Sequence, residues 1–237
     1  MNSRPQTRST LTAFTLVELL TVITIIAILM GLLFPAITTA KDQARKAQAK
    51  AAVMQIATAV KQYYSEYAKY PLGTATPTGT PADVLFGGAA TPPNSNQIVF
   101  DILRNTNSTG TAGTPNPYNP RGIVFYEDKS AADPNAPKAG FATQDASSGG
   151  ITVKKGALVD PWGVEYGIAI DGDYNNQIIN LPYNDFSGTT TGPLVGVAVF
   201  SLGKDKGVGT APSGGTGDGM YRKSATSAPS DDIVSWQ

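Results

Sequence analysis

The chain contains no cysteine and no histidine among its 237 residues. Without them it cannot form a disulfide, a thiolate nucleophile, a histidine general base, or a zinc site built from histidine or cysteine. Most familiar hydrolytic mechanisms are thereby excluded. The lack of cysteine leaves the redox compartment open, because both oxidising and reducing compartments contain proteins without disulfides.

Charged residues are few, and the two signs are unevenly placed along the chain. Lys and Arg together number 18, as do Asp and Glu, so the formal net charge is zero. Residues 41–69 contain six basic and two acidic residues, whereas the chain beyond residue 70 contains ten basic and fifteen acidic. No cluster of Lys and Arg with interleaved aromatic residues occurs. The sequence therefore does not indicate a nucleic-acid surface.

The longest apolar run contains a single charged residue. Residues 14–37 hold no charged side chain except Glu18. A helix of about 20 apolar residues matches a hydrocarbon core about 30 Å thick, so this run predicts a membrane-spanning helix. A carboxylate inside a bilayer costs about 2.5 kcal/mol or more on insertion scales. We therefore expect Glu18 to have a partner or a task.

The residues around Glu18 resemble the start of a type IV prepilin. A short basic leader ends at Ala13, Phe14 follows it, and Glu18 comes four residues after Phe14. In that family a membrane peptidase cuts before a Phe and methylates the new amino group. The resemblance implies cleavage between Ala13 and Phe14, and pairing of Glu18 with the Phe14 amino group during filament assembly. Many relatives share a proline at the place of Pro35, and most carry Gly where this chain has Ala13.

Two other interpretations of the apolar run stay open. An ordinary secretory signal would use Arg4 and Arg8 as its basic region and residues 38–40 as its cleavage site, but its apolar part should be uncharged and only about 7–15 residues long. A plain membrane anchor would need no particular residue at position 18. The flanking charges also conflict with an outward-facing head, because more basic residues follow the run than precede it.

A helical pattern continues from residue 38 to residue 70. Apolar residues recur there at spacings of three or four, which predicts one buried face of an amphipathic helix. We expect this helix to continue from the membrane segment, to lose one hydrogen bond near Pro35, and to end at Tyr70, which precedes a proline. The expected buried face comprises Ala40, Ala44, Ala47, Ala51, Met54, Ala57, Val60, Tyr64 and Tyr67.

The chain beyond residue 70 predicts a small head, so that the fold class is α+β, with a long helix packed on a small antiparallel sheet. We expect loops over residues 72–94 and 105–120, and a short helix over residues 95–104 capped by Ser95. A β-hairpin is expected around a turn at residues 171–176. The expected strands cover residues 123–126, 151–153, 157–159, 162–170, 177–181 and 194–201.

Two segments of this head resemble the major pseudopilin of type II secretion systems. The first is the sequence DPWG at residues 160–163, followed by a tyrosine at position 166. The second begins with FSLGKD at residue 200 and ends with DDIVSW at residue 231, and it resembles that family's closing calcium-binding loop. The resemblance implies a calcium site formed by Asp205, Asp231, Asp232 and the carbonyl of Leu202. An insertion rich in Gly, Ser, Thr and Pro separates the two halves of this second segment.

Two further patterns have plainer explanations. Asp171, Asp173 and Asn175 alternate as the first ligands of a calcium loop do, but the glycine at the sixth position and the glutamate at the twelfth are missing. We interpret them as turn residues and as the next candidate for calcium. The sequence GGTGDG at residues 214–219 lacks the lysine and the surrounding βαβ unit of a phosphate loop, so we interpret it as a loop.

Together the resemblances imply a structural, non-enzymatic filament subunit with a leader (residues 1–13), a membrane and assembly helix (14–37), the soluble half of the stem helix (38–70) and a head (71–237). They imply a single-pass protein of the bacterial inner membrane with its head in the periplasm. The implied partners are copies of itself, minor pseudopilins, a prepilin peptidase and the inner-membrane secretion platform. The alternatives are a type IV pilin used in adhesion or motility, and a membrane-anchored binding protein or carbohydrate-active enzyme.

Overall fold

The computed structural model describes residues 15–75, 83–108, 115–179, 181–183, 192–209 and 230–236. The chain divides into two compact units, residues 1–44 and residues 45–237. Helix α1 (Leu16–Tyr67) passes from the first unit into the second. It continues through Pro35 without interruption, which confirms the prediction of one long helix.

The first unit is the apolar part of α1. Its large apolar side chains are exposed, from 78% exposure at Leu16 to 40% at Ile37. Within the described residues, α1 is the one helix that is long and apolar enough to cross a membrane. A helix that is apolar on all sides is stable only where lipid or protein surrounds it, because exposed apolar surface in water costs about 25 cal/mol per Å².

The second half of α1 packs against the head through a face that differs in part from the predicted one. Of the nine expected residues, Ala57 and Val60 are buried and Tyr67 is half-buried. The other six are exposed, including Met54 (46%) and Tyr64 (39%), together with Ala40, Ala44, Ala47 and Ala51. The reason is that alanines occur on several faces of this helix, so their spacing does not define which face is buried. The larger apolar side chains, such as Ile56 and Tyr63, determine which face of the helix is buried. The buried face comprises Ala49, Ala52, Val53, Ile56, Ala57, Ala59, Val60 and Tyr63.

Helix α1 also ends three residues earlier than predicted. The last helical residue is Tyr67, and Ala68 adopts a positive φ of 52° while its backbone N–H donates to the carbonyl of Tyr64. This is a left-handed C-terminal cap, which closes the helix before the proline at position 71 can affect it.

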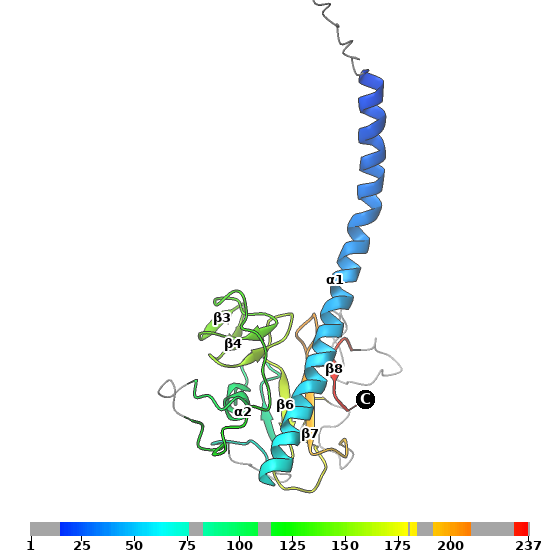
Figure 1. Cartoon of the computed structure of the whole chain (residues 1–237). Helices are drawn as coiled ribbons and strands as arrows, with labels where there is room; N and C mark the ends of the chain where they lie inside the picture. Colours follow the sequence, from blue (N-terminus) through cyan, green and yellow to red (C-terminus); the bar gives the residue numbers. More distant parts are fainter. Residues whose placement is uncertain are drawn as a thin grey trace, which may run out of the picture. The chain divides into compact units, whose positions relative to one another are not determined.

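A four-stranded antiparallel sheet forms the centre of the head, which confirms the α+β fold class (Figure 1). Its strand order is β1-β6-β7-β8, and every neighbouring pair is antiparallel. The four strands are β1 (Val84–Phe86), β6 (Gly167–Ile170), β7 (Val197–Ser201) and β8 (Ile233–Val234). The smaller elements are α2 (Gln97–Leu103), β2 (Gly140–Phe141), β3 (Ala146–Ser148), β4 (Ile151–Val153) and β5 (Leu158–Val159).

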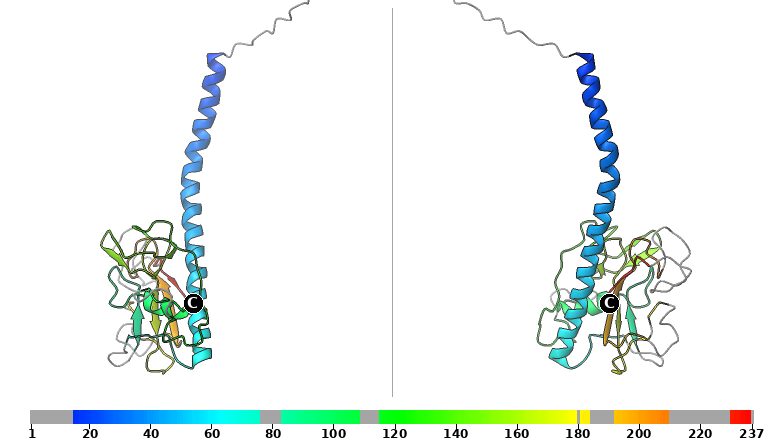
Figure 2. Two further views of the ribbon diagram at one scale, coloured as in Figure 1. Left: turned by 60° about the vertical axis from the view of Figure 1, so that its left-hand side comes forward. Right: turned by 90° about the vertical axis from the view of Figure 1, so that its right-hand side faces the viewer.

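Both faces of this sheet are buried. Alternate side chains, such as Ile168 and Val199, lie in the core formed with α1, and the views in Figure 2 place the second half of α1 along one side of the sheet. Side chains of opposite orientation, such as Phe200, lie in a second core with Ile178 and Tyr183. Successive side chains of a strand point to opposite faces, so the strands are apolar throughout because both faces are covered.

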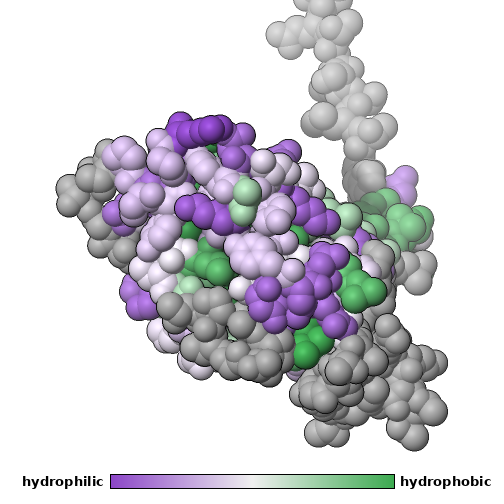
Figure 3. Space-filling model, turned by 90° about the horizontal axis from the view of Figure 1, so that it is seen from below, coloured by the Kyte–Doolittle hydropathy of each residue, from purple (hydrophilic) through white to green (hydrophobic). Residues whose placement is uncertain are grey.

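The surface of the head contrasts with its interior. On the side shown in Figure 3, hydrophilic and weakly polar residues cover most of the described surface, and the hydrophobic areas are small and separate from one another. A mixed surface of this kind is normal for a domain in contact with water.

Two predicted strands are absent from the described part of the chain, and four short strands, β1, β2, β3 and β8, were not predicted. Strand β6 pairs with β1 and β7, so the predicted hairpin is wrong, and the described residues of 177–181 form an irregular segment that covers the outer face of the sheet. Strand β1 lies in the predicted loop 72–94, because a three-residue strand gives too short a pattern to recognise. Residues 123–126 form no strand, and Tyr126 instead packs against Phe100.

The other local predictions are close to the structure. Strand β4 covers the predicted residues 151–153, β5 lies within 157–159, and β7 forms the second half of 194–201. Helix α2 lies within 95–104, and the Ser95 hydroxyl accepts a hydrogen bond from the N–H of Gln97 at 3.2 Å. Its N-cap residue is Asn96, one position later than predicted.

Candidate functional site

The C-terminal acidic residues predicted as metal ligands meet at one end of the sheet. Asp205 follows β7, and Asp231 and Asp232 immediately precede β8. Because β7 and β8 are antiparallel, with Ser201 opposite Ile233, the end of β7 lies beside the start of β8. The three side chains each offer a carboxylate oxygen within 4.8 Å of the other two. We call Asp205, Asp231 and Asp232 the C-terminal cluster.

Backbone N–H groups hold one oxygen of each carboxylate in this cluster. The N–H of Lys204 donates to Asp231 Oδ2 at 2.8 Å, and the N–H of Gly209 donates to Asp232 Oδ2 at 2.9 Å. The N–H of Gly207 donates to Asp205 Oδ1 at 2.9 Å. The loop after β7 therefore folds around the acidic side chains.

The second carboxylate oxygen, Oδ1, of both Asp231 and Asp232 is available to a cation. Asp231 and Asp232 are 5% and 7% exposed, and the Oδ1 atom of each is buried without a hydrogen bond of ordinary geometry among the described residues. Asp232 also interacts with the hydroxyl groups of Ser230 and Tyr183. A buried carboxylate oxygen without a full set of partners is costly, so the donor set fits an oxygen-binding cation such as calcium.

Gly203 allows the backbone to approach this cluster closely. Its φ is +69°, and a Cβ atom there would lie 2.7 Å from the carbonyl oxygen of Asp231 and 2.8 Å from its carboxylate. No other residue fits that space. The neighbouring Leu202 places its side chain in the outer core, with 2% exposure. The role of its carbonyl as a ligand stays a prediction.

The electrostatics of the cluster disfavour three bare negative charges. Burial raises the pKa of Asp232 to about 7. Burial also raises the pKa of Asp231, with a further contribution from the charge of Asp205, while Lys46 acts in the opposite direction. A divalent cation bound here would lower the pKa of both carboxyls, because an opposite charge nearby favours the ionised form. Calcium takes six to eight oxygens, so carbonyls or water would complete the set that these residues begin.

Asp160 joins the two segments that resemble a pseudopilin. It is fully buried, and its Oδ1 accepts hydrogen bonds of 2.8–3.0 Å from the backbone N–H groups of Trp162, Gly163 and Val164. Its Oδ2 accepts a 2.7 Å hydrogen bond from the hydroxyl of Ser201 at the end of β7. The DPWG turn therefore fixes the strand end from which the loop of the C-terminal cluster starts. This positioning role of Asp160 was not predicted, although Asp before Pro and Gly is a turn signal.

The predicted turn at residues 171–176 is confirmed, and an acid distant in sequence joins it. The N–H of Asn176 donates to Asp171 Oδ2 at 2.7 Å, and the N–H of Asn175 donates to Asp173 Oδ1 at 3.3 Å. The side chain of Asp83 lies with those of Asp171 and Asp173. The Asn175 side-chain amide donates to Asp173 Oδ2 at 3.0 Å. No pattern in the sequence connects residue 83 with this turn.

At the start of α1, Glu18 forms a capping box with Thr15. The hydroxyl and the backbone N–H of Thr15 donate to Glu18 Oε2 at 2.8 and 2.9 Å, and the N–H of Glu18 donates to the Thr15 hydroxyl at 3.2 Å. This arrangement satisfies backbone groups that a helix start leaves open. Ala13 and Phe14 lie outside the described residues, as do residues 214–219. Processing at residue 14 and an assembly role for Glu18 stay predictions.

Comparison of the chain with protein-family models, with curated proteins and with solved structures gave no match. The architecture is consistent with that of pilins: a long N-terminal helix has an apolar first half, and its second half packs on an antiparallel sheet.

Proposed function

We propose that the protein is a structural, non-enzymatic subunit of a type II secretion pseudopilus, a periplasmic filament that acts as a piston in protein secretion. A prepilin peptidase cleaves it before Phe14 and methylates the new N-terminus. Copies then assemble through the apolar part of α1, together with minor pseudopilins and the secretion platform of the bacterial inner membrane. Before assembly the chain crosses that membrane once, with its head in the periplasm.

The observation that carries this proposal is the continuity of α1. One helix is apolar over residues 16–37, with every described side chain there exposed, and its later residues form a face of the head's core. Cleavage of a secretory signal after residue 40 would cut inside this continuous helix, ahead of the buried face that begins at Ala49. The apolar segment is therefore retained in the mature protein in this proposal, and Glu18 remains the charged residue inside it.

Calcium at the C-terminal cluster has a mechanical role in this proposal. The loop between Asp205 and Asp231 spans a long insertion, and closing a loop of that length costs about 3 kcal/mol from its length term alone. The chain has no cysteine with which to offset this cost. A cation shared by Asp205 and the Asp231–Asp232 pair would hold β8 in the sheet.

The first prediction concerns the N-terminus of the mature protein. In membrane-derived protein from cells that contain a prepilin peptidase, mass spectrometry should find a chain that starts at Phe14 and carries one N-terminal methyl group. The same chain made without the peptidase should keep its leader and should not form filaments. An intact Met1 in peptidase-containing cells would favour a plain anchor, and a start at Lys41 would favour a secretory signal.

The nearest alternative is a type IV pilin used in adhesion or motility. The direct contact between the DPWG turn and the end of β7 favours the pseudopilin, since these are the two segments that carry that resemblance. Deletion of the gene separates the two functions. Loss of protein secretion with unchanged adhesion and motility supports the pseudopilin, and the opposite result supports the pilin.

A further inference from the structure

We propose that Asp83, Asp171 and Asp173 form a second divalent-cation site, suited to calcium, at the end of the sheet opposite to the C-terminal cluster. The site would join the start of β1 to the turn that follows β6. It is independent of the proposed function, because it rests on different residues and requires neither filament assembly nor secretion.

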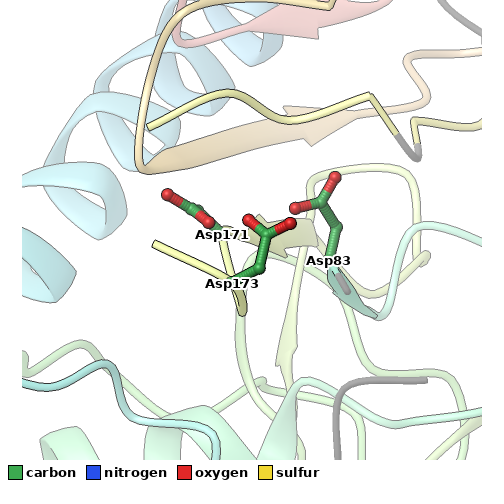
Figure 4. A group of neighbouring side chains, drawn as sticks. All are labelled: Asp83, Asp171 and Asp173. Atoms are coloured by element: carbon green, nitrogen blue, oxygen red, sulfur yellow. The ribbon is translucent and has the colours of Figure 1, made fainter. Parts of the chain in front are cut away.

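The register of the sheet brings these acids together. Asp83 immediately precedes β1 and Asp171 immediately follows β6, and these strands are antiparallel with Val84 opposite Ile170. Asp171 therefore lies next to Asp83, and the turn carries Asp173 back toward both. Figure 4 shows the carboxylate of Asp173 between those of Asp171 and Asp83. One oxygen of each side chain lies within 4.8 Å of the other two.

A buried oxygen of Asp171 points to a ligand. Asp171 is 1% exposed, and its Oδ2 accepts the hydrogen bond from Asn176. Its Oδ1 is buried and makes no hydrogen bond of ordinary geometry within the described ranges, while the Asp173 carboxylate lies beside it and interacts with Asp171. Two neighbouring carboxylates are unfavourable unless a shared proton or a cation lies between them, and a divalent cation is the remedy that also suits the third acid, Asp83.

The shape of the cluster suits calcium. Two oxygens on opposite sides of a calcium ion, each about 2.4 Å from it, are about 4.8 Å apart, so oxygens no farther apart than this can share one ion. Asp83 and Asp171 are buried and Asp173 is exposed. Water can therefore reach the site from the side of Asp173 and complete a shell of six to eight oxygens.

The position of the site suggests what the ion stabilises. Strand β1 is an edge strand of three residues, which offers few hydrogen bonds to the sheet. Asp83 Oδ2 also accepts a hydrogen bond from the N–H of Ile179 at 2.9 Å, in the segment that covers the outer face. An ion bound to Asp83 and Asp171 would therefore connect the edge strand, the turn after β6 and the covering segment.

Calcium counting tests the proposal. The full-length protein in detergent is depleted of calcium over a chelating resin and then equilibrated with radioactive calcium up to about 5 mM, which covers weak extracellular sites. We expect two bound ions per chain in the wild type and one in Asp173→Asn. Asp173 is the safest position to change, because its side chain is exposed. The matched control is Asp133→Asn, where another exposed aspartate accepts from the N–H two residues later, and it should still bind two ions.

The C-terminal cluster provides an independent comparison. Asp232→Asn should also lose one ion, and the double variant should bind none. If Asp232→Asn binds as the wild type does while Asp173→Asn loses an ion, the second site stands and the C-terminal site fails. Equal binding by Asp173→Asn and the wild type would overturn the second site. Far-ultraviolet circular dichroism in the ion-free state verifies that each variant folds. In that state Asp173→Asn should melt no lower than the wild type, because the substitution removes like-charge repulsion.

Discussion

Glu18 has two separable roles at the residue scale. One is local, because its Oε2 takes both donor groups of Thr15 in the capping box. The other is electrostatic, because its charge could pair with the amino group that cleavage would create at Phe14. Cleavage before Phe14 leaves the N–H of Thr15 as an ordinary amide, so the capping box can persist in the mature protein. Conservative substitutions can therefore separate the two roles.

The second prediction uses Glu18→Gln and Thr15→Val. Glutamine can still close the capping box but carries no charge, whereas valine removes the capping hydroxyl and leaves the charge. If the charge drives assembly, Glu18→Gln should reduce filament yield at least tenfold, since a broken buried ion pair costs about 3–5 kcal/mol. Thr15→Val should cost only about 1 kcal/mol of helix stability and keep most assembly. Filament yield by electron microscopy and sedimentation measures both, and the reverse order would make the cap the important role.

Helix α1 shows, at the element scale, which side chains determine packing. Its buried face includes Val53, Ile56 and Tyr63, while Met54 and Tyr64 on neighbouring positions are exposed. The hydroxyl of Tyr63 donates to the carbonyl of Tyr118 at 2.6 Å, so even the polar atom of this face has a partner in the head. The second half of α1 is therefore part of the head's core.

The third prediction compares two apolar side chains on this helix. Ile56→Ala should lower the free energy of unfolding of the head by about 2–4 kcal/mol, because Ile56 is fully buried and its removal leaves a cavity. The control is Met54→Ala, two residues earlier on the exposed side of the helix. It should change the free energy of unfolding by about 0.5 kcal/mol or less. Denaturant titration of the full chain in detergent measures both. Similar losses in the two variants would contradict the packing described here.

The same elements show how far the sequence predicts the fold. Helix α1 and strand β7 are long or strongly apolar, and both were predicted at nearly the right place. Strand β1 was not, because three residues show no period and their partner, β6, lies more than eighty positions away along the chain. Likewise, the residues of the C-terminal cluster came from a resemblance, whereas Asp83 joins Asp171 only through strand pairing. Local sequence patterns therefore predict long or strongly apolar helices and strands. They do not predict which strands pair with one another across long stretches of the chain.

At the scale of the whole molecule, the packed core found in the described part of the chain lies in the head. An acidic cluster lies at each end of the head's sheet. Asp171 follows β6 at the end where β7 begins, and Asp205 follows β7 at the end where β6 begins. Both clusters join segments that lie far apart in the sequence, the task that disulfides perform in many secreted domains. Stability of the head should therefore depend on divalent cations and, through the same carboxylates, on pH.

The fourth prediction is that calcium stabilises the head more at pH 8 than at pH 5. The pKa of Asp232 is raised from 3.8 to about 7 in the folded head, so between these values the folded state binds more protons than the unfolded state. Stability without the ion should then fall as the pH rises from about 4 to 7, by an amount on the order of a few kcal/mol. Calcium needs the ionised form, so it offsets this loss only at the higher pH.

Thermal unfolding of the full chain in detergent, after calcium removal on a resin and again with about 5 mM calcium, measures this effect at both values. The melting temperature without calcium should be lower at pH 8 than at pH 5, and the increase on adding calcium should be several degrees larger at pH 8. Other buried acids with raised pKa values, such as Asp160 and Glu165, change stability in the same direction with pH, so the comparison needs Asp232→Asn. That variant keeps the side-chain shape but cannot ionise. It should lose most of the difference in calcium stabilisation between the two pH values, and an unchanged difference would show that Asp232 does not bind the ion.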